Sequence, residues 1–438
     1  MGMVSVDIGE RYGWPPERSS ARRRFVTRKT FYWLAYGALL LGVTVAGAEL
    51  VAAFLVPSWP ARMLRPVPTG GVSQATGHVI DVTYNSWGMR DRERSITRTP
   101  EVRTRAVLVG DSFLEGAFGP DPLNAYIERR WAAEGRKDIE AINLGVTATG
   151  PRQYYHRIAR VALELEPDAI VLFFYGGNDF LSERFGDRLL PPAIAELPRP
   201  SLLGAVAPRL TWFAVERLRL SEIGGSNKPI PDEFATLQRI VEAPPSERTA
   251  RAVAHIRQFY HPQRSEAAIR DILSRGDDAF WRAFESKDRD REYLLGWLLG
   301  NMVDWETASW PSPRTAEEAA RMDMDPVEGS LSWLVAAHRL AREHGIKFTV
   351  ALAPLGTVDP NYVDYWRHWP RYYGLSLAAE ARTKRLAVRL RESGVPFVDL
   401  REDLAGQAGT YRLIDGHWTV RGHEIVAARM AKEILQLR

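Results

Sequence analysis

The sequence predicts a three-layer α/β/α fold built around a mainly parallel β-sheet. Short apolar runs recur along the chain, most of them closed by Gly or Pro, as is typical of parallel strands covered on both faces. Helix-like segments separate these runs, so strand and helix alternate as in a sheet with right-handed crossovers. The five predicted strands are "RAVLVG" ending at Gly110, "IEAINLG" ending at Gly145, "PDAIVLFFYGG" ending at Gly177, "GIKFTVALAP" at 345–354 and "VPFVDL" at 395–400.

The helical segments include one stretch that is too long for a simple crossover. Roughly 160 residues, from about 181 to 344, separate the third and fourth predicted strands. We therefore expect a helical insertion over about 181–330, which either walls one side of the ligand-binding edge or forms a separate structural subdomain. The predicted helices outside the insertion are 153–165, 331–344 and 375–393, and those between the third and fourth strands are 209–221, 246–260, 264–275, 277–300 and 313–323.

The bulk composition is that of a globular protein and excludes several classes of function. Of the 438 residues 45% are hydrophobic and 26% are charged, and the formal net charge is +4. Much of the positive charge lies in a run before residue 30 rather than on a folded face, so we expect no nucleic-acid partner. The absence of cysteine excludes disulfides and thiolate catalysis. The nine histidines lack metal-ligand spacing, so we expect no metal and no cofactor.

An apolar segment at 31–56 predicts a single-pass membrane anchor. It exceeds the ~20 residues that cross a bilayer as a helix, and Glu49 is its only side chain expected to be charged. The basic residues before it favour a cytoplasmic tail at 1–30, which places later residues outside the cytoplasm. A cleaved signal peptide is the alternative, because "AGA" at 46–48 resembles a cleavage site.

The Pro- and Gly-rich residues 57–80 then predict a linker that leads into a domain at 81–438.

Polar residues follow the ends of three predicted strands and precede the last helix. The carboxyl ends of parallel strands meet at one edge of a sheet, so these residues are expected to lie together. They are Asp111 and Ser112 after the first strand, Gly145 at the end of the second, Asn178 and Asp179 after the third, and Asp415 and His417 near the C-terminus.

This set of residues suits acyl transfer through a serine nucleophile. The Ser112 hydroxyl needs a general base, for which His417 is the candidate, and Asp415 would accept the other ring proton. Backbone N–H groups of Ser112 and Gly145, with the Asn178 amide, would donate hydrogen bonds to the oxyanion. The alternative is that Ser112 only caps the following helix, a common role for serine.

Four short blocks carry a resemblance to a known superfamily. "GDSF", "NLGVTATG", "GGND" and "DGHWTVRGH" occur in this order between residues 109 and 423. They resemble the four sequence blocks of the SGNH (GDSL-type) esterases and acyltransferases, although none of them covers the insertion. The resemblance implies a flavodoxin-like strand order 2-1-3-4-5. It also implies a nucleophile at Ser112, oxyanion residues at Gly145 and Asn178, and the pair Asp415 and His417.

Two details narrow the resemblance to membrane-anchored bacterial members. The common Asp-x-x-His spacing is shortened here to Asp415-Gly-His417, followed by Trp, which is similar to the SGNH domains of bacterial polysaccharide O-acetyltransferases. "YNSWGMRD" at 84–91 also resembles an element of such members, so Arg90 is expected to orient the sheet edge or to bind an anionic substrate group. From the local residues alone, a plain turn with an exposed arginine is the favoured interpretation. The implied location is the bacterial inner membrane, with a periplasmic catalytic domain.

The remaining candidates are a second histidine, two carboxylates and an aromatic loop. His423 competes with His417 for the base role, but it is expected to pack or cap at the start of the last helix. Asp111 and Asp179 are expected to hold their turns through backbone hydrogen bonds.

The aromatic loop is at 353–374. Trp366 and Trp369 in it are candidate platforms for a sugar ring, and packing against the insertion is the alternative.

Taken with the resemblance, these residues imply an esterase that removes O-acyl groups, O-acetyl in particular, from a glycan. One alternative is an O-acyltransferase that moves an acetyl group onto a polysaccharide, with a membrane acyl-donor protein as its partner. It shares the first half-reaction of the esterase. A second alternative is an inactive scaffold that binds glycan.

Overall fold

The computed structural model describes residues 28–55, 85, 87–116, 121–147, 149–180, 206–207, 209–210, 231–260, 263–284, 291–309, 311–322 and 324–437. The chain divides into two units after Val51, and each is described by itself. The basic tail up to residue 27, the predicted linker at 57–80 and nearly all of the predicted helix at 209–221 lie outside the described residues.

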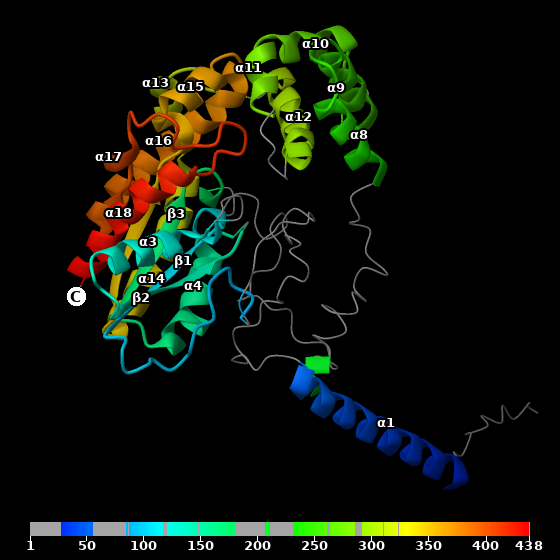
Figure 1. Cartoon of the computed structure of the whole chain (residues 1–438), viewed down its shortest axis with the longest axis vertical. Helices are drawn as coiled ribbons and strands as arrows, with labels where there is room; N and C mark the ends of the chain where they lie inside the picture. Colours follow the sequence, from blue (N-terminus) through cyan, green and yellow to red (C-terminus); the bar gives the residue numbers. More distant parts are fainter. Residues whose placement is uncertain are drawn as a thin grey trace, which may run out of the picture. The chain divides into compact units, whose positions relative to one another are not determined.

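Helix α1, Arg28–Leu55, contains the predicted membrane anchor (Figure 1). Its segment Lys29–Ala52 is long and apolar enough to cross a bilayer, judged by length and composition. Phe31, Tyr32 and Trp33 near its start are 62%, 58% and 71% exposed. Within the described residues, the apolar run therefore forms a helix of membrane-crossing length that ends at Leu55.

A five-stranded parallel sheet forms the centre of the second unit. The strand order is β2-β1-β3-β4-β5 and every neighbouring pair is parallel, which confirms the predicted order 2-1-3-4-5. Gly110 lies opposite Gly145, so these two predicted strand ends meet at one edge of the sheet. The strands are β1 Thr104–Gly110, β2 Ile139–Gly145, β3 Ala169–Tyr175, β4 Lys347–Ala353 and β5 Phe397–Asp399.

Helices cover both faces of this sheet, as the predicted three-layer fold requires (Figure 1). Alternate side chains of β1 point to opposite faces, with Ala106 and Leu108 in one apolar cluster and Val107 and Val109 in the other. Full burial of such side chains contributes about 1.5–3 kcal/mol each. The first cluster includes α3 Leu123–Ala133 and α18 Val420–Gln436, and the second includes α4 Pro151–Arg160, α14 Asp325–Glu343 and part of α16 Pro370–Glu392.

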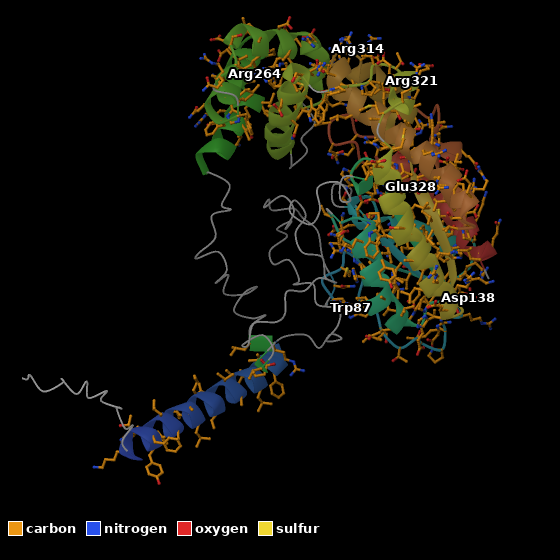
Figure 2. The ribbon with its side chains drawn as sticks, turned by 180° about the vertical axis from the view of Figure 1, so that it is seen from behind. Trp87, Asp138, Arg264, Arg314, Arg321 and Glu328 are labelled. Carbon is orange, nitrogen blue, oxygen red and sulfur yellow. The ribbon has the colours of Figure 1, made fainter. Side chains whose placement is uncertain are left out.

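The helices outside the insertion occur where they are predicted, with shifted ends. The predicted helix at 153–165 is α4 followed by a separate 3-10 helix, Ala162–Leu165. Helices α14 and α16 begin six and five residues earlier than predicted, and each carries a proline in its first turn, Pro326 and Pro370. The fixed φ of proline suits this position. Glu328 of α14, labelled in Figure 2, pairs with Arg389 of α16 at 2.8 Å.

The insertion after β3 is helical where the structure describes it. Two predicted helices, at 246–260 and 264–275, match α9 and α10, whereas the predicted helix at 277–300 is divided into α11 and α12. The segment at 313–323 contains only a short helix, and α8 was not predicted. The helices are α8 Pro231–Val241, α9 Pro245–Phe259, α10 Glu266–Ser274, α11 Asp277–Arg282, α12 Arg291–Thr307 and α13 Ala316–Ala320.

The predicted aromatic loop at 353–374 is mostly helical, so its assignment as a loop is wrong. It contains a 3-10 helix, Gly356–Val358, then α15, Pro360–Trp366, and the start of α16. Asp359 caps α15 by accepting the N–H of Asn361 at 2.8 Å. An Asp followed by Pro is a signal for a helix start, and the sequence has this signal at Asp359-Pro360, directly before the aromatic residues.

Candidate active site

Ser112 is the first residue of the short helix α2, Ser112–Glu115, and only Asp111 separates it from the end of β1. We call residues 111–116 the nucleophile turn. The N-cap of α2 is Asp111, whose Oδ1 accepts the N–H of Phe113 at 3.0 Å, as predicted for that carboxylate. The alternative in which Ser112 is merely the cap is therefore wrong. Gly116 ends this short helix with a φ of 68°, a conformation that favours glycine.

The nucleophile and the base candidates meet, although 305 positions separate them in the sequence. His417 Nε2 lies 2.8 Å from Ser112 Oγ. The imidazole stacks on the ring of Phe113, with centroids 4.6 Å apart and planes 26° from parallel. Phe113 in turn packs against Tyr175 and Trp418. These ring contacts restrict the plane of the imidazole and keep its Nε2 on the side of Ser112.

Asp415 contacts His417 through one carboxylate oxygen. Its Oδ1 accepts the backbone N–H of His417 at 2.9 Å and lies 3.6 Å from the ring Nδ1. The longer distance allows charge attraction but exceeds a hydrogen bond. Burial alone would raise the pKa of Asp415, but the interactions with His417 and the charge of Arg412 lower it below its usual value. The carboxylate is therefore ionised at neutral pH.

The Gly145 N–H, which is predicted to bind the oxyanion, has a partner within the protein. It donates to Asn143 Oδ1 at 2.7 Å, so the single amide hydrogen of Gly145 is already engaged. A Cβ at this position would lie 2.5 Å from the backbone nitrogen of Glu115. Glycine is therefore needed here because the end of β2 approaches the nucleophile turn closely.

Asn178 lies beside the nucleophile turn, as predicted. Its Nδ2 donates to Asp111 Oδ2 at 3.0 Å. A carboxamide nitrogen carries two hydrogens, so a second one is left for a substrate oxygen. The neighbouring Asp179 holds its own turn by accepting the Tyr175 N–H at 2.9 Å and the Tyr154 hydroxyl at 2.8 Å. Burial raises the pKa of Asp111.

Arg90 packs beneath the nucleophile turn. It is 4% exposed, and its Nη1 donates to the Glu115 carbonyl at 3.5 Å, so the alternative of an exposed arginine is wrong. Its own carbonyl accepts Asn143 Nδ2 at 3.0 Å. Trp87 in the same segment, labelled in Figure 2, is also buried. These contacts fit a role in orienting the sheet edge, while binding of an anionic substrate group stays a prediction.

His423 is a packing residue. It is 2% exposed, its ring stacks on Tyr126 with centroids 5.1 Å apart, and its Nδ1 is 2.9 Å from the Thr419 carbonyl oxygen. Burial lowers the pKa of His423 to about 4. His417, which contacts Ser112, is therefore the better candidate for the base.

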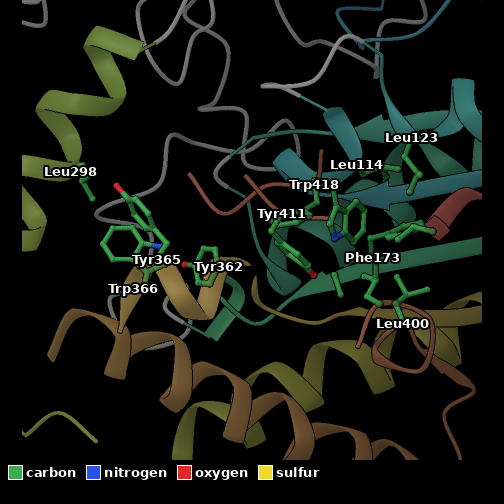
Figure 3. Packing of buried hydrophobic residues seen from close by; sticks show 14 of the residues in the cluster. Leu114, Leu123, Phe173, Leu298, Tyr362, Tyr365, Trp366, Leu400, Tyr411 and Trp418 are labelled. Carbon is green, nitrogen blue, oxygen red and sulfur yellow. The ribbon is translucent and has the colours of Figure 1, made fainter. Parts of the chain in front are cut away.

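The two tryptophans predicted as sugar platforms are buried, at 1% exposure for Trp366 and 0% for Trp369. Trp366 Nε1 donates to the Leu413 carbonyl at 2.7 Å, and Trp369 Nε1 donates to the Ile272 carbonyl of α10 at 2.8 Å. Figure 3 shows Trp366 and its neighbour Tyr365 on the side of α12 that carries Leu298. The rings therefore present no surface to a sugar. The structure instead has the alternative, in which they pack against the insertion.

Sequence reasoning missed Asp359, which anchors the segment that carries the base. We call residues 409–417 the base loop. The Asp359 carboxylate is fully buried and accepts the N–H groups of Gly409, Thr410 and Tyr411 at 3.1, 2.7 and 2.9 Å. The sequence signal at Asp359, an Asp before Pro360, indicates only a helix cap.

Glu115 was also missed. It is 1% exposed, and its Oε2 accepts both the N–H and the hydroxyl of Thr147. It therefore ties the nucleophile turn to the segment that follows β2. In the sequence it resembles an ordinary solvent-facing helix residue.

No family model matches the sequence, and no curated protein matches it either. Solved structures of GDSL-like lipases and acylhydrolases do resemble the chain. A GDSL-like lipase from Bacteroides thetaiotaomicron VPI-5482 has 11% identity and a TM-score of 0.33, over 79% of this chain and 93% of that chain. A lipase/acylhydrolase from Enterococcus faecalis has 12% identity and a TM-score of 0.29, over 76% of this chain and 95% of that chain. At these values the functional conclusion rests on the geometry of the site.

Proposed function

We propose that the chain is a serine esterase of the SGNH (GDSL) type, which hydrolyses O-acyl esters through an acyl-enzyme on Ser112. The observation that carries this proposal is the 2.8 Å contact between Ser112 Oγ and His417 Nε2 at the carboxyl edge of a parallel sheet. Serine is a weak nucleophile unless a base adjoins it, and this pair meets that requirement.

In the first half-reaction, Ser112 Oγ attacks the ester carbonyl carbon as its proton passes to His417 Nε2. The ionised Asp415 stabilises the imidazolium. The bond to the alcohol oxygen then breaks as Nε2–H returns the proton to that oxygen, leaving an acyl group on Ser112. In the second half-reaction water attacks this acyl carbon as one of its protons passes to His417 Nε2. The bond to Ser112 Oγ then breaks as Nε2–H returns the proton to Oγ, which releases the acid and the free serine.

The oxyanion would receive two hydrogen bonds in this scheme. One comes from the Ser112 N–H, the first amide of α2, because amides in the first turn have no intrahelical acceptor. The other comes from the second hydrogen of Asn178 Nδ2. Each donor of this kind is worth about 3 kcal/mol in the transition state.

The substrate is proposed to be an O-acetylated glycan outside the cytoplasm, with the protein anchored in a bacterial inner membrane by α1. Support comes from the membrane-crossing length of α1 and from the Asp-Gly-His-Trp spacing at 415–418. The buried Trp366 and Trp369 lend no support to a glycan. The same spacing favours, as a second candidate, an O-acyltransferase in which a sugar hydroxyl replaces water and a membrane protein supplies the acyl group.

The test is hydrolysis of p-nitrophenyl acetate by the full chain in detergent, compared with Ser112→Ala. The wild type is expected to release p-nitrophenol, and the variant to lose at least about 10³-fold in kcat. Ser332→Ala, an equal change at an exposed serine of α14, is the matched control. Equal rates for wild type and Ser112→Ala would contradict the proposal. Mass spectrometry of acetylated oligosaccharides then separates release of acetate from its transfer.

A further inference from the structure

Beyond the Ser112–His417 pair, the second oxygen of the Asp415 carboxylate lies against an arginine. Arg412 Nε lies 3.1 Å from Asp415 Oδ2, with side chains 25% and 4% exposed. We infer that Arg412 is a positioning residue that holds this carboxylate in the orientation serving His417. The inference rests on the proposed function, because it concerns the same reaction.

The two carboxylate oxygens of Asp415 have different partners. Oδ1 accepts the His417 backbone N–H at 2.9 Å and is the oxygen on the side of the ring Nδ1, whereas Oδ2 contacts Arg412. The terminal torsion of an aspartate has broad energy wells, so its neighbours decide which oxygen faces the imidazole. The ion pair therefore opposes rotation of Oδ1 away from the ring.

The backbone of Arg412 closes the same turn. Its N–H donates to the His417 carbonyl at 2.7 Å, and its carbonyl accepts the Gly416 N–H at 3.2 Å. Gly416 has a φ of 72°, the left-handed conformation that the short Asp-Gly-His turn uses. Arg412, itself a residue of the base loop, thus contacts His417 and Gly416 through its main chain and the Asp415 carboxylate through its side chain.

The remaining distance between Asp415 and His417 explains why this contact matters. At 3.6 Å, Oδ1 needs only a small shift to reach the ring Nδ1–H when the imidazole becomes charged. A carboxylate that is free to rotate would have to be oriented again in each cycle. The role assigned to Arg412 is to keep Asp415 pre-oriented, without touching the substrate.

The experiment compares Arg412→Gln and Arg412→Lys in the full chain, with p-nitrophenyl acetate as substrate. Arg412→Gln is expected to lower kcat about 10- to 100-fold with KM little changed, because misplacement by about 1 Å costs up to about 10²-fold. Arg412→Lys keeps a cation beside Oδ2 and is expected to recover most of the rate. Arg421→Gln, an equal loss of charge at an exposed arginine that pairs with Gln407, is the matched control.

A double variant decides whether Arg412 acts through Asp415. If it does, Arg412→Gln with Asp415→Asn is no slower than Asp415→Asn alone, because coupled residues are not additive. Effects that multiply, or a wild-type kcat for Arg412→Gln, would overturn the inference. If circular dichroism shows that Arg412→Gln does not fold, Arg412→Lys provides the test. A folded Arg412→Lys whose kcat is as low as that of Asp415→Asn would also overturn the inference. An inactive wild type would instead refute the proposed function.

Discussion

The nucleophile turn and the base loop reach the same site by different structural means. Ser112 lies two residues after the end of β1, a strand buried at all seven residues, and the adjacent Asp111 caps the helix that Ser112 begins. In the segment that carries His417, the β-type pairing is an isolated bridge between Tyr411 and Trp418. The nucleophile thus depends on the sheet and on its own neighbours in sequence, whereas the base depends on side chains from other elements.

The base loop is held from several directions. Asp359 binds three of its N–H groups and Trp366 binds the Leu413 carbonyl, while within the loop Arg412 pairs with Asp415. Changes at such contacts can reduce activity while the sheet stays intact. Substitutions near the nucleophile turn, by contrast, affect the transition state directly.

The largest effect after loss of the nucleophile is expected for Asp415→Asn. A neutral amide cannot stabilise the imidazolium and favours the wrong tautomer, so kcat should fall by about 10²- to 10⁴-fold. Steady-state kinetics with p-nitrophenyl acetate provide the measurement, and circular dichroism checks the fold. A kcat close to that of the wild type would show that the base works without this carboxylate.

On the nucleophile side, Asn178→Ala is expected to lower kcat by about 10²- to 10³-fold through loss of an oxyanion donor. Because Asn178 also donates to Asp111, thermal unfolding should be measured on the same sample. An unchanged kcat would remove Asn178 from the oxyanion site and leave it only the contact with Asp111.

His423→Phe is expected to flatten the dependence of stability on pH. The pKa of His423 is about 4 in the folded chain and about 6.5 when unfolded, so the unfolded state takes up the proton first as pH falls. The contribution of the neutral His423 to the free energy of unfolding is therefore fully present above pH 6.5. It falls by about 3 kcal/mol in total as the pH drops from about 6.5 to 4. Urea unfolding across this range should show the loss in wild type but not in His423→Phe. Activity at pH 7 should persist, and its loss would assign the base role to His423.

Asp359→Asn tests whether the base loop depends on its buried anchor. The amide group places N–H groups against the donors of Thr410 or Gly409, which should lower the free energy of unfolding by about 2 kcal/mol. Denaturant titration measures this change, and hydrogen exchange at 409–417 should rise more than at β1. An equal rise of hydrogen exchange at 409–417 and at β1 would refute the idea that the base loop depends on Asp359 more than the sheet does.

The smallest effect is expected for Trp366→Phe, which removes the hydrogen bond to Leu413 in the base loop and costs about 1 kcal/mol. Trp369→Phe removes an equivalent bond to Ile272 in the insertion and is the matched control. The rate of labelling by a fluorophosphonate should fall for Trp366→Phe but not for Trp369→Phe. Equal rates for the two variants would mean that this contact serves stability only.

Local patterns in the sequence predicted the sheet and the residues that meet at its edge, whereas the strand order came from the resemblance to the SGNH blocks. Apolar runs mark strands, and Ser112 and His417 each lie in a short recognisable block. Gly145 shows where such reasoning ends. A glycine at a strand end can donate its amide or permit close approach, and the sequence does not show that the Asn143 side chain accepts the Gly145 N–H.

The remaining errors and omissions share one physical cause. Asp359 lies about fifty positions before the N–H groups that it binds, so no local pattern reveals the pairing. An aromatic cluster such as Tyr365, Trp366 and Trp369 suits a core and a sugar platform equally well in composition, and only its packing against the insertion distinguishes them.

The central claim is that Ser112 is a nucleophile activated by His417, and covalent labelling tests it most directly. The full chain should be treated with a fluorophosphonate, digested and analysed by mass spectrometry. A single adduct on the peptide that contains Ser112, lost in Ser112→Ala and strongly slowed in His417→Ala, is the predicted result. No adduct on the folded wild type, or an adduct that persists in Ser112→Ala, would contradict the account.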